Sequence, residues 1–596
     1  MRQSGFTLRA VVLGLFFALL NTCINTYLGI NFGIGISMGV LAVLIAYALL
    51  NRLSTSRLSL RELSLIYIIS TSSLSAYWVL GIAIFAVERF EDASFPSWLL
   101  PPREIVANKI LSIQYWLPPI AMLFTLEMLS TILGLVFCYV IGNDLASEER
   151  MIFPNIAMSV SLIHACDRGG ELVNKAMKAL VIGLIVTLLI KISSFILSKD
   201  LMTINLSPYL PYNIPLIISF NLGLMALGYI LSANTSLSLM VTGMALYTLI
   251  SPILCSRGII ESSPDINKLY NSILFKFSLS PALGIFLLGN AILSILLALK
   301  KYSSKREATY TGKSFLYLYS SLWRRILSNR KLLLVCLIPT SIIFALAYIL
   351  NPLSPSSRYL SLIFVSYALF LASFIEFTIL TKMAGETGMT MGILGIVLYD
   401  LPILMSGYSG YSAYLALPYF KPSTWTGPSV VGLMKYSDIL ELRFRDIVKG
   451  KLIGWLPTFI LSALLTLFLW KEFGFGTPDM PALGLIPSLM YIRMLATRSI
   501  TGGGILNLRS FIIGGAVGAL LEMLTPVSSM GIALGLLLPP QYAIPIGIGG
   551  LVRLYTDRKY GTKYFREEGL LLASGVMAGS MVIDVIMTII ATFIKL

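Results

Sequence analysis

The chain has 596 residues, of which 57% are hydrophobic and only 12% are charged. A chain this apolar does not stay dispersed in water, so its composition predicts an integral membrane protein. A spanning helix needs roughly 20 apolar residues, and the succession of such stretches excludes a large soluble domain. Binding and chemistry are therefore expected within the bilayer.

The formal net charge of +16 is concentrated in one polar segment, residues 300–331. Against the single acid Glu307 this segment holds Lys300, Lys301, Lys305, Arg306, Lys313, Arg324, Arg325, Arg330 and Lys331. Basic residues that flank apolar spans mark the cytoplasmic side of a membrane, whereas a nucleic-acid site needs exposed basic surface with interleaved aromatic residues. We predict a cytoplasmic linker here, and no nucleic-acid partner.

The cysteines and the single histidine argue against a disulfide or zinc framework. Five cysteines are scattered without a close pair, and His164 is the one histidine of the chain. Disulfide scaffolds and structural zinc sites both need clustered ligands at short spacing. We therefore expect no cofactor and no resident metal.

The N-terminal stretch is expected to be a retained first span. Arg2 and Arg9 precede an apolar run over residues 10–20, and the run continues to Ile30 without a small-residue cleavage site. A cleaved signal peptide would need such a site after a shorter apolar region. The segment therefore belongs to the membrane domain.

The loops between the first four predicted spans carry unequal charge. These spans are expected at residues 8–30, 33–50, 63–87 and 115–141. Residues 51–61 contain Arg52, Arg57 and Arg61 without an acid, whereas residues 88–109 mix both signs. Because short cytoplasmic loops are enriched in lysine and arginine, the N-terminus is predicted to be cytoplasmic.

A short apolar segment follows the fourth span. Residues 153–165 are too few to cross a bilayer and are flanked by charged residues on both sides. We predict a re-entrant half-helix, introduced by Glu149, Phe153, Pro154 and Asn155. Four more spans are expected at residues 176–197, 214–231, 237–254 and 272–299. If the short segment turns back, residues 300–331 return to the side of the N-terminus.

The part of the chain after the basic linker contains both clear spans and interrupted ones. Clear spans are predicted at residues 332–350, 360–381, 389–405, 452–470, 483–496, 511–524 and 570–594. Shorter segments broken by glycine and proline lie at residues 419–433, 526–540 and 543–554. Two halves with broken segments are typical of transporters built from repeats. The predicted organisation is an N-terminal half (1–299), a linker (300–331) and a C-terminal half (332–596).

Acidic residues inside the predicted spans are candidates for function. Glu127, Asp400, Glu522 and Asp584 lie deepest, and Glu376 lies nearer the end of its span. Each costs a few kcal/mol in hydrocarbon, so they are expected to face the interior of the bundle. Asp400, Glu522 and Asp584 are candidates for proton coupling. Alternatively, such a carboxylate caps a backbone gap or pairs with a distant lysine or arginine.

Polar side chains on the first span offer neutral contacts to a ligand. Asn25, Tyr27 and Asn31 lie on this span, and with Glu127 they are expected near a substrate at the bilayer midplane. The run of serines and threonine at residues 70–73 is weaker support, because such side chains often bond back to their own helix.

Enzyme motifs supply an alternative function. Gly407-Tyr-Ser-Gly410 matches the GxSG of intramembrane proteases, and His164 is the one residue that could act as base for Ser409. This alternative is a membrane-embedded enzyme or lipid-handling protein with an intramembrane cavity. No P-loop is present, so ATP hydrolysis of that kind is excluded, and the scattered acids form no selectivity ring of a channel.

Three stretches resemble the oligopeptide transporter superfamily, which includes the yellow stripe-like metal-chelate transporters. The first is Asn25-Thr-Tyr-Leu-Gly-Ile-Asn-Phe-Gly33, and the second is Glu148-Glu-Arg-Met-Ile-Phe-Pro154. The third runs over residues 531–553 with Leu538-Pro-Pro540 and Gly547-Ile-Gly-Gly550, followed by Gly575 to Gly579. They occur in the order of the family. The chain resembles a divergent member, because Asn31 stands where the family often has lysine and Asn155 where glutamate is common.

The resemblance implies an all-α polytopic membrane protein with about sixteen transmembrane helices in two related halves, including re-entrant or broken helices. It also implies a secondary active transporter in the cell membrane that imports small peptides or amino-acid-derived metal chelates by proton-coupled alternating access. The two departures from the family pattern leave the cargo and the coupling ion open.

Overall fold

The computed structural model of the chain divides into two compact units. It describes residues 6–33, 39–53, 58–73, 75–148, 151–168, 171–197, 201–211, 214–263, 265–289, 315–352, 357–390, 392, 394–477, 480–499, 506–525 and 527–595. Unit 1 comprises Met1–Asn143, Ser320–Leu380 and Met391–Gly502, and unit 2 comprises Asp144–Tyr319, Thr381–Thr390 and Gly503–Leu596. Each unit takes segments from both predicted halves, and the repeat relation of the halves stays a prediction. Residues 300–314 of the predicted linker lie outside the described part.

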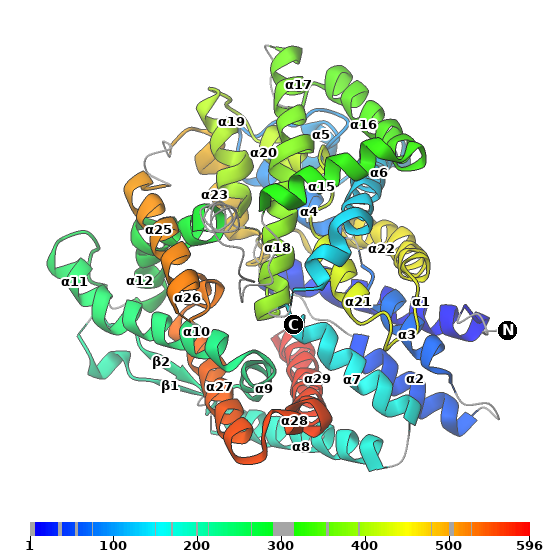
Figure 1. The fold of residues 1–596 in the computed structure, drawn as a ribbon. Coiled ribbons are helices and arrows are strands. Elements are labelled where there is room, and N and C mark those ends of the chain that lie inside the picture. Colours follow the sequence, from blue (N-terminus) through cyan, green and yellow to red (C-terminus); the bar gives the residue numbers. More distant parts are fainter. Residues whose placement is uncertain are drawn as a thin grey trace, which may run out of the picture. The chain divides into compact units, whose positions relative to one another are not determined.

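The described secondary structure is almost entirely helical, as Figure 1 shows. The exception is a hairpin in which β1 (Thr203–Asn205) pairs antiparallel with β2 (Ile217–Ser219). Eight helical stretches are long and apolar enough to cross a membrane: Leu8–Asn31, Ile113–Ala146, Asn174–Ser194, Ala233–Ser256, Lys268–Gly289, Arg330–Leu350, Arg358–Thr387 and Phe444–Phe473. The polytopic all-α class predicted from composition is confirmed.

Unit 1 is assembled around the first helix. Its helices are α1 (Leu8–Phe32), α2 (Gly39–Leu53), α3 (Leu60–Ser70), α4 (Tyr77–Arg89), α5 (Arg103–Ala107), α6 (Ile113–Ala146), α16 (Arg330–Leu350), α17 (Arg358–Tyr367), α19 (Leu401–Met405), α20 (Ser412–Ala416), α21 (Gly432–Lys435), α22 (Phe444–Phe473) and α23 (Ile486–Ala496). Helix α1 packs against α3 and α22, and the hydroxyls of Thr26 and Ser462 lie 3.2 Å apart. Unit boundaries fall inside α6, α15 (Phe315–Ser328) and α18 (Ser373–Thr387).

Unit 2 contains a close crossing of two long helices. Its helices are α7 (Pro154–Arg168), α8 (Glu171–Ile196), α9 (Leu222–Ile230), α10 (Ala233–Ala245), α11 (Ser251–Ser256), α12 (Ile266–Ile273), α13 (Leu279–Gly284), α25 (Leu508–Leu524), α26 (Ser529–Leu537), α27 (Pro540–Tyr560), α28 (Thr562–Tyr564) and α29 (Leu570–Lys595). Helices α8 and α29 pack together, and a Cβ atom at Gly579 would lie 2.1 Å from the Leu180 carbonyl oxygen. The glycine pair Gly575 and Gly579 therefore serves close helix packing.

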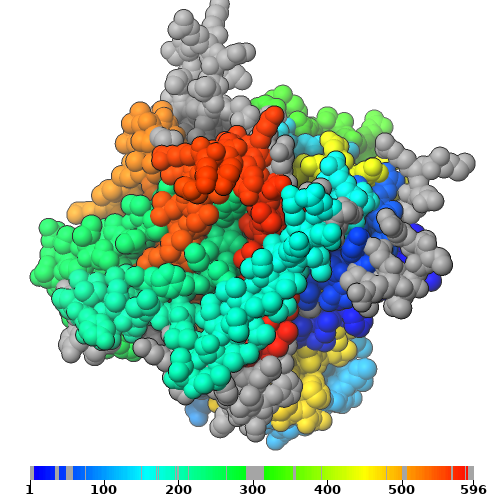
Figure 2. Space-filling view, turned by 90° about the horizontal axis from the view of Figure 1, so that it is seen from below, coloured from blue at the N-terminus to red at the C-terminus, as the bar shows by residue number. Residues whose placement is uncertain are grey.

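The outer face of α8 is apolar and lies at the surface of the molecule in the view of Figure 2. Ile182, Ile185 and Leu189 are each about half exposed on it. Lipid tails are as apolar as these side chains, so an exposed face of this kind suits contact with the bilayer.

Several helices contain π-helical turns, which are rare and are found most often at functional sites. They lie at Leu246–Ile250, Leu274–Ser278, Ile285–Gly289, Ala368–Ala372, Ile396–Asp400, Gly427–Val431 and Phe565–Gly569. Three of them belong to unit 1, at Ala368–Ala372, Ile396–Asp400 and Gly427–Val431. These three adjoin the charged residues of the candidate site.

The single span predicted at residues 63–87 is wrong. Helix α3 ends at Ser70 and α4 begins at Tyr77. The hydroxyls of Ser70 and Thr71 both bond back to the Tyr67 carbonyl, at 3.0 and 2.8 Å, and such local bonds compete with continuation of a helix. The Ser462 hydroxyl accepts the Ala76 N–H at 3.2 Å and so satisfies the backbone after the break.

Three further predicted segments differ from the observed elements. Residues 214–231 are not a span, since they form strand β2 and the nine-residue α9, whose start is capped by the Asn221 side chain. The span predicted at 389–405 is the shorter helix Ile396–Met405. Residues 543–554 are not interrupted, because α27 continues through Pro545 in its second turn.

Candidate functional site

Unit 1 contains a buried ion pair between Glu376 of α18 and Lys421. Lys421 Nζ lies 2.5 Å from Glu376 Oε2, and the two side chains are only 5% and 6% exposed. The same carboxylate oxygen accepts bonds from the Tyr399 hydroxyl at 2.9 Å and the Thr424 hydroxyl at 3.0 Å. Lys421 Nζ also lies 4.8 Å from the centre of the Tyr399 ring. We call Glu376, Tyr399, Lys421 and Thr424 the Glu376 cluster.

The backbone that carries Lys421 is irregular and is supported by α6. It lies between a single 3₁₀ turn, Leu417–Tyr419, and the π turn Gly427–Val431. The Ser130 hydroxyl donates to the Lys421 carbonyl, and the Ser130 carbonyl accepts the Ser423 N–H at 2.8 Å. Non-helical backbone at membrane depth is tolerated only where protein satisfies its polar groups. Helix α6 provides these partners to the broken segment.

Two acids predicted from the sequence join the Glu376 cluster. Glu127, one turn before Ser130 on α6, interacts electrostatically with the Lys421 ammonium. Asp400 ends the π turn Ile396–Asp400, accepts the Tyr491 hydroxyl at 3.0 Å and interacts electrostatically with Glu376. Two carboxyl groups, Glu376 and Glu127, thus interact with Lys421, and Asp400 interacts with Glu376. With all four groups ionised, this region carries a formal charge of −2.

The predicted substrate residues of α1 lie along a helix-packing surface. The Asn25 side chain donates to Asn21, one turn earlier, at 2.9 Å. Asn31 accepts the Ala482 N–H at 3.2 Å, and its buried Nδ2 has no hydrogen-bond partner among the described residues. Tyr27 is half-buried. A role of these side chains in substrate binding stays a prediction.

The predicted re-entrant motif contacts the end of α18 within unit 2. The Phe153 N–H donates to the Gly385 carbonyl at 2.8 Å, and the Asn155 side chain donates to the Gly388 carbonyl at 2.7 Å. Pro154 then begins α7. Phe153 has a positive φ of 49°, which is uncommon for an aromatic residue. Glu149 lies outside the described residues.

The other coupling candidates belong to unit 2. Glu522 accepts the Ser529 N–H at 3.1 Å, at the start of α26. This contact matches the alternative in which an intramembrane carboxylate caps a backbone gap. Asp584 lies on α29, and its side chain is outside the described part of the structure. The described contacts therefore link Glu127 and Asp400 to the Glu376 cluster, whereas those of Glu522 lie within unit 2.

Sequence reasoning missed Lys421, Tyr399 and Thr424, and did not choose Glu376. The available signal was a lysine within the broken apolar segment of residues 419–433, because an unpaired ammonium there would be too costly. Among the described residues, no group of three His, Cys, Asp or Glu side chains is placed to hold a metal ion.

The structure combines long apolar helices, broken segments whose backbone bonds to neighbouring helices, and a buried charged cluster. Together these features define a polytopic membrane protein of the transporter class. A family model described as OPT oligopeptide transporter protein matches residues 5–591. The chain belongs to this oligopeptide transporter family over nearly its whole length, and it is a transporter, not an enzyme. Membership implies oligopeptides or metal chelates as cargo. The search of curated proteins found no match.

The enzyme alternative is therefore wrong. Ser409 lies in a turn between Gly407, with φ 88°, and Gly410, with φ 127°. The neighbouring Tyr408 hydroxyl lies 2.8 Å from the Ser412 hydroxyl. The resemblance of this turn to a protease motif reflects a glycine-rich connection within a transporter.

Proposed function

We propose that the chain imports small peptides or amino-acid-derived metal chelates across the cell membrane by proton-coupled alternating access. The Glu376 cluster, Glu127 and Asp400 form the charged centre of this transporter. The observation that carries the proposal is the buried Glu376–Lys421 pair of unit 1, with which the half-buried carboxyl groups of Glu127 and Asp400 interact. The family supports transport of such cargo.

The excess of negative charge gives a physical reason for proton coupling. A carboxylate in low dielectric is costly unless it is paired or protonated. Lys421 already pairs with Glu376, so Glu127 and Asp400 are the groups that gain most from a proton. Protonation changes the net charge of the charged centre. It therefore also changes the relative free energy of the two conformations between which the transporter alternates. Asp400 and Glu127 are therefore the first coupling candidates, and Glu522 and Asp584 are secondary ones.

The topology that goes with this function has about sixteen spans. Eight long helices account for half of that number, and the shorter helices supply the rest by pairing end to end or by entering and leaving on one side. In this arrangement α7 is re-entrant, the N-terminus and residues 300–331 are cytoplasmic, and Asn25, Tyr27 and Asn31 face the transport path.

Uptake into proteoliposomes tests the proposal. The purified chain is reconstituted, and uptake of radiolabelled tri-alanine is measured with and without an inward proton gradient. We expect the gradient to increase uptake and Glu127→Gln or Asp400→Asn to remove that increase. The matched control is Glu472→Gln, an exposed residue near the end of α22. Uptake that ignores the gradient would overturn proton coupling.

A further inference from the structure

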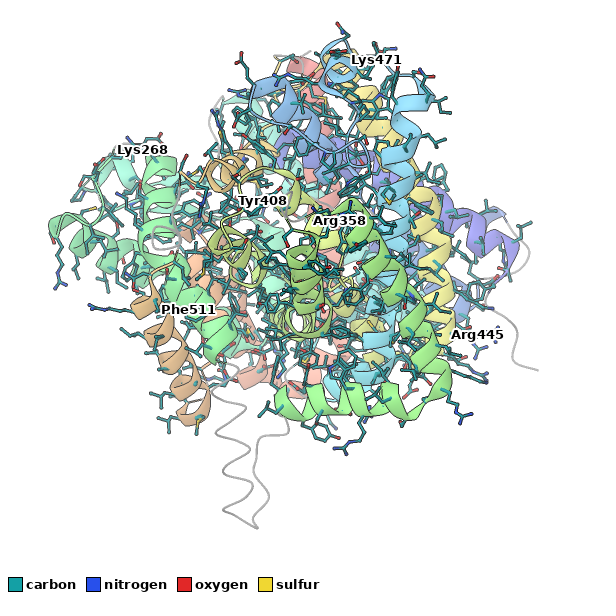
Figure 3. The ribbon with its side chains drawn as sticks, turned by 90° about the horizontal axis from the view of Figure 1, so that it is seen from above. Lys268, Arg358, Tyr408, Arg445, Lys471 and Phe511 are labelled. Atoms are coloured by element: carbon teal, nitrogen blue, oxygen red, sulfur yellow. The ribbon has the colours of Figure 1, made fainter. Side chains whose placement is uncertain are left out.

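The buried hydroxyl of Tyr414 makes no hydrogen bond to the described residues. Tyr414 lies on α20 and is 4% exposed. Its ring packs edge-on against Tyr408, which is labelled in Figure 3, with the ring centres 5.9 Å apart. Buried polar groups normally have partners. An orphan hydroxyl inside a transporter therefore points to a group that is present only when cargo is bound.

Tyr414 interacts electrostatically with Asp400, and also with Tyr408 and Arg498. Asp400 receives one described hydrogen bond, from Tyr491, and no lysine or arginine pairs with it in the part of the chain that the structure describes. Arg498 is exposed, and its guanidinium donates to the Leu404 carbonyl at 3.4 Å.

Lys421 shows how this region holds an ammonium group. Its Nζ contacts a carboxylate oxygen of Glu376, a hydroxyl of Thr424 and the face of the Tyr399 ring. Asp400 offers a comparable carboxylate, which accepts the Tyr491 hydroxyl at 3.0 Å, and Tyr414 interacts electrostatically with both Asp400 and Tyr491.

We propose that Asp400, Tyr414 and Tyr491 form a subsite for an ammonium group of the cargo, such as the free amino end of a peptide. An ammonium has three donors, so one can go to Asp400 and another to the Tyr414 oxygen. A proton alone would neutralise Asp400 but leave the Tyr414 hydroxyl without a partner. The subsite depends on the proposed transport function, and it predicts that the cargo carries an ammonium group.

Binding to blocked and free peptides tests the subsite on the purified full chain. The probes are tri-alanine, tri-alanine amide, which keeps the ammonium, and N-acetyl-tri-alanine, which lacks it. A ligand that binds only the folded state raises the unfolding temperature. We expect the first two probes to raise it and the acetylated probe to have no effect. Equal shifts with all three, or none with any, would overturn the subsite.

Two substitutions sharpen the test. Asp400→Asn should abolish the shift, and Tyr414→Phe should weaken binding about tenfold, as expected for loss of a hydrogen bond to a charged group. Tyr414→Phe should also keep or raise the unfolding temperature without ligand, because it removes an unpaired buried hydroxyl. A merely structural tyrosine would lower it. Asp438→Asn and Tyr209→Phe, both exposed, are the controls.

Different experimental results would overturn the subsite and the proposed proton coupling. Gradient-driven uptake that acetylated tri-alanine inhibits as well as the free peptide would overturn the subsite and leave transport intact. Binding that requires the free amino end, together with uptake that ignores the gradient, would overturn proton coupling and support the subsite.

Discussion

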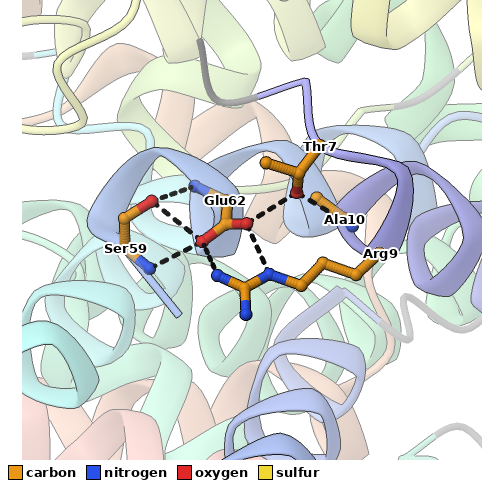
Figure 4. A network of polar contacts seen from close by, with 5 residues as sticks. All are labelled: Thr7, Arg9, Ala10, Ser59 and Glu62. Carbon is orange, nitrogen blue, oxygen red and sulfur yellow. Dashed lines mark hydrogen bonds and ion pairs between the residues drawn. The ribbon is translucent and has the colours of Figure 1, made fainter. Parts of the chain in front are cut away.

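Two buried glutamates of unit 1 each meet a basic side chain, but their surroundings differ. Glu62, near the start of α3, is 3% exposed. Arg9 donates to both of its oxygens, at 2.7 and 2.8 Å, and Thr7 donates at 2.6 Å, as Figure 4 shows. Ser59 adds bonds from its N–H and its hydroxyl and completes a capping box with Glu62. Both carboxylate oxygens are fully used at a regular helix start.

Glu376 accepts fewer hydrogen bonds than Glu62. All three of its described hydrogen bonds, from Tyr399, Lys421 and Thr424, fall on Oε2. The lysine comes from irregular backbone and also interacts with a second acid, Glu127. The Glu62 network therefore stabilises one arrangement, whereas Glu127 and Asp400 add negative charge beside the Glu376 cluster that Lys421 does not compensate. The comparison shows that burial of an ion pair does not by itself reveal how completely the surrounding groups satisfy its carboxylate.

The largest expected effect comes from removing Lys421. Lys421→Met leaves the buried Glu376 and the neighbouring Glu127 without their ammonium, and breaking a buried pair from one side costs about 3–5 kcal/mol. We expect a sharp fall in unfolding temperature, measured by intrinsic fluorescence in detergent. Adding Glu376→Gln should recover part of it, because the double substitution removes both charges. A single Lys421→Met variant as stable as the wild type would show that the pair is not buried as described.

The next largest effect is expected at Glu62. Glu62→Gln weakens the bonds from Arg9 and Thr7 and should cost about 1.5–3 kcal/mol, as for hydrogen bonds to charged groups. Uptake per folded molecule, and its dependence on the proton gradient, should be unchanged. The same measurements on Glu376→Gln should show altered uptake. Altered gradient dependence in Glu62→Gln would remove the distinction between the two glutamates.

A smaller effect is expected from the pH dependence of the stability that Glu62 contributes. Glu62 precedes the apolar part of α3. Burial acts to raise the pKa of its carboxyl, but the hydrogen bonds from Arg9, Thr7 and Ser59 outweigh burial and lower the pKa to about 2. Unfolded glutamate has a pKa of about 4.3. Its stabilising contribution is therefore complete above about pH 4.3 and is lost as the pH falls towards about 2.

The corresponding measurement compares the unfolding temperatures of the wild type and Glu62→Gln over a pH series. We expect their difference to be constant from about pH 8 to about pH 5.5 and to shrink in more acidic buffer. If the difference already changed between about pH 8 and pH 6, the carboxyl would not be held as strongly as its five hydrogen bonds from Arg9, Thr7 and Ser59 imply.

The smallest effects come from a matched pair of threonines. Thr7→Val and Thr424→Val each remove one hydroxyl donor from a glutamate and keep the size of the side chain. Each should cost about 1 kcal/mol of stability. Thr424→Val should in addition lower gradient-driven uptake, because Thr424 also contacts Lys421, whereas Thr7→Val should not. Equal uptake by the two variants would contradict a functional role for the Glu376 cluster.

Local features of the sequence predicted part of this site. Glu127 and Asp400 stood out because an acid inside an apolar stretch needs a partner wherever the helix packs. Glu522 stood out for the same reason, yet the structure uses it to accept a backbone N–H at the start of α26. Spacing alone does not distinguish these roles, since the distinction depends on which groups other helices bring to the carboxylate.

The broken segments were predictable to different degrees. The interruption at residues 419–433 was visible from glycine and proline, whereas the break after Ser70 lay inside an apolar run and was missed. That break depends on serine and threonine bonds to their own helix and on the Ser462 hydroxyl, which is 386 residues away from Ala76. Local hydropathy does not reveal a hydrogen-bond partner that is so distant in the chain.

By itself, the sequence determined residence in a membrane, an all-α architecture, the presence of buried acids and membership of a transporter family, because these follow from composition, run length and local motifs. Only the tertiary structure decided that Glu376 pairs with Lys421, 45 residues further on, and that α6 brings Glu127 to the same ammonium. It also decided that the Tyr414 hydroxyl has no hydrogen-bond partner among the described residues. Pairing over such distances is set by packing, and packing is a property of the whole chain.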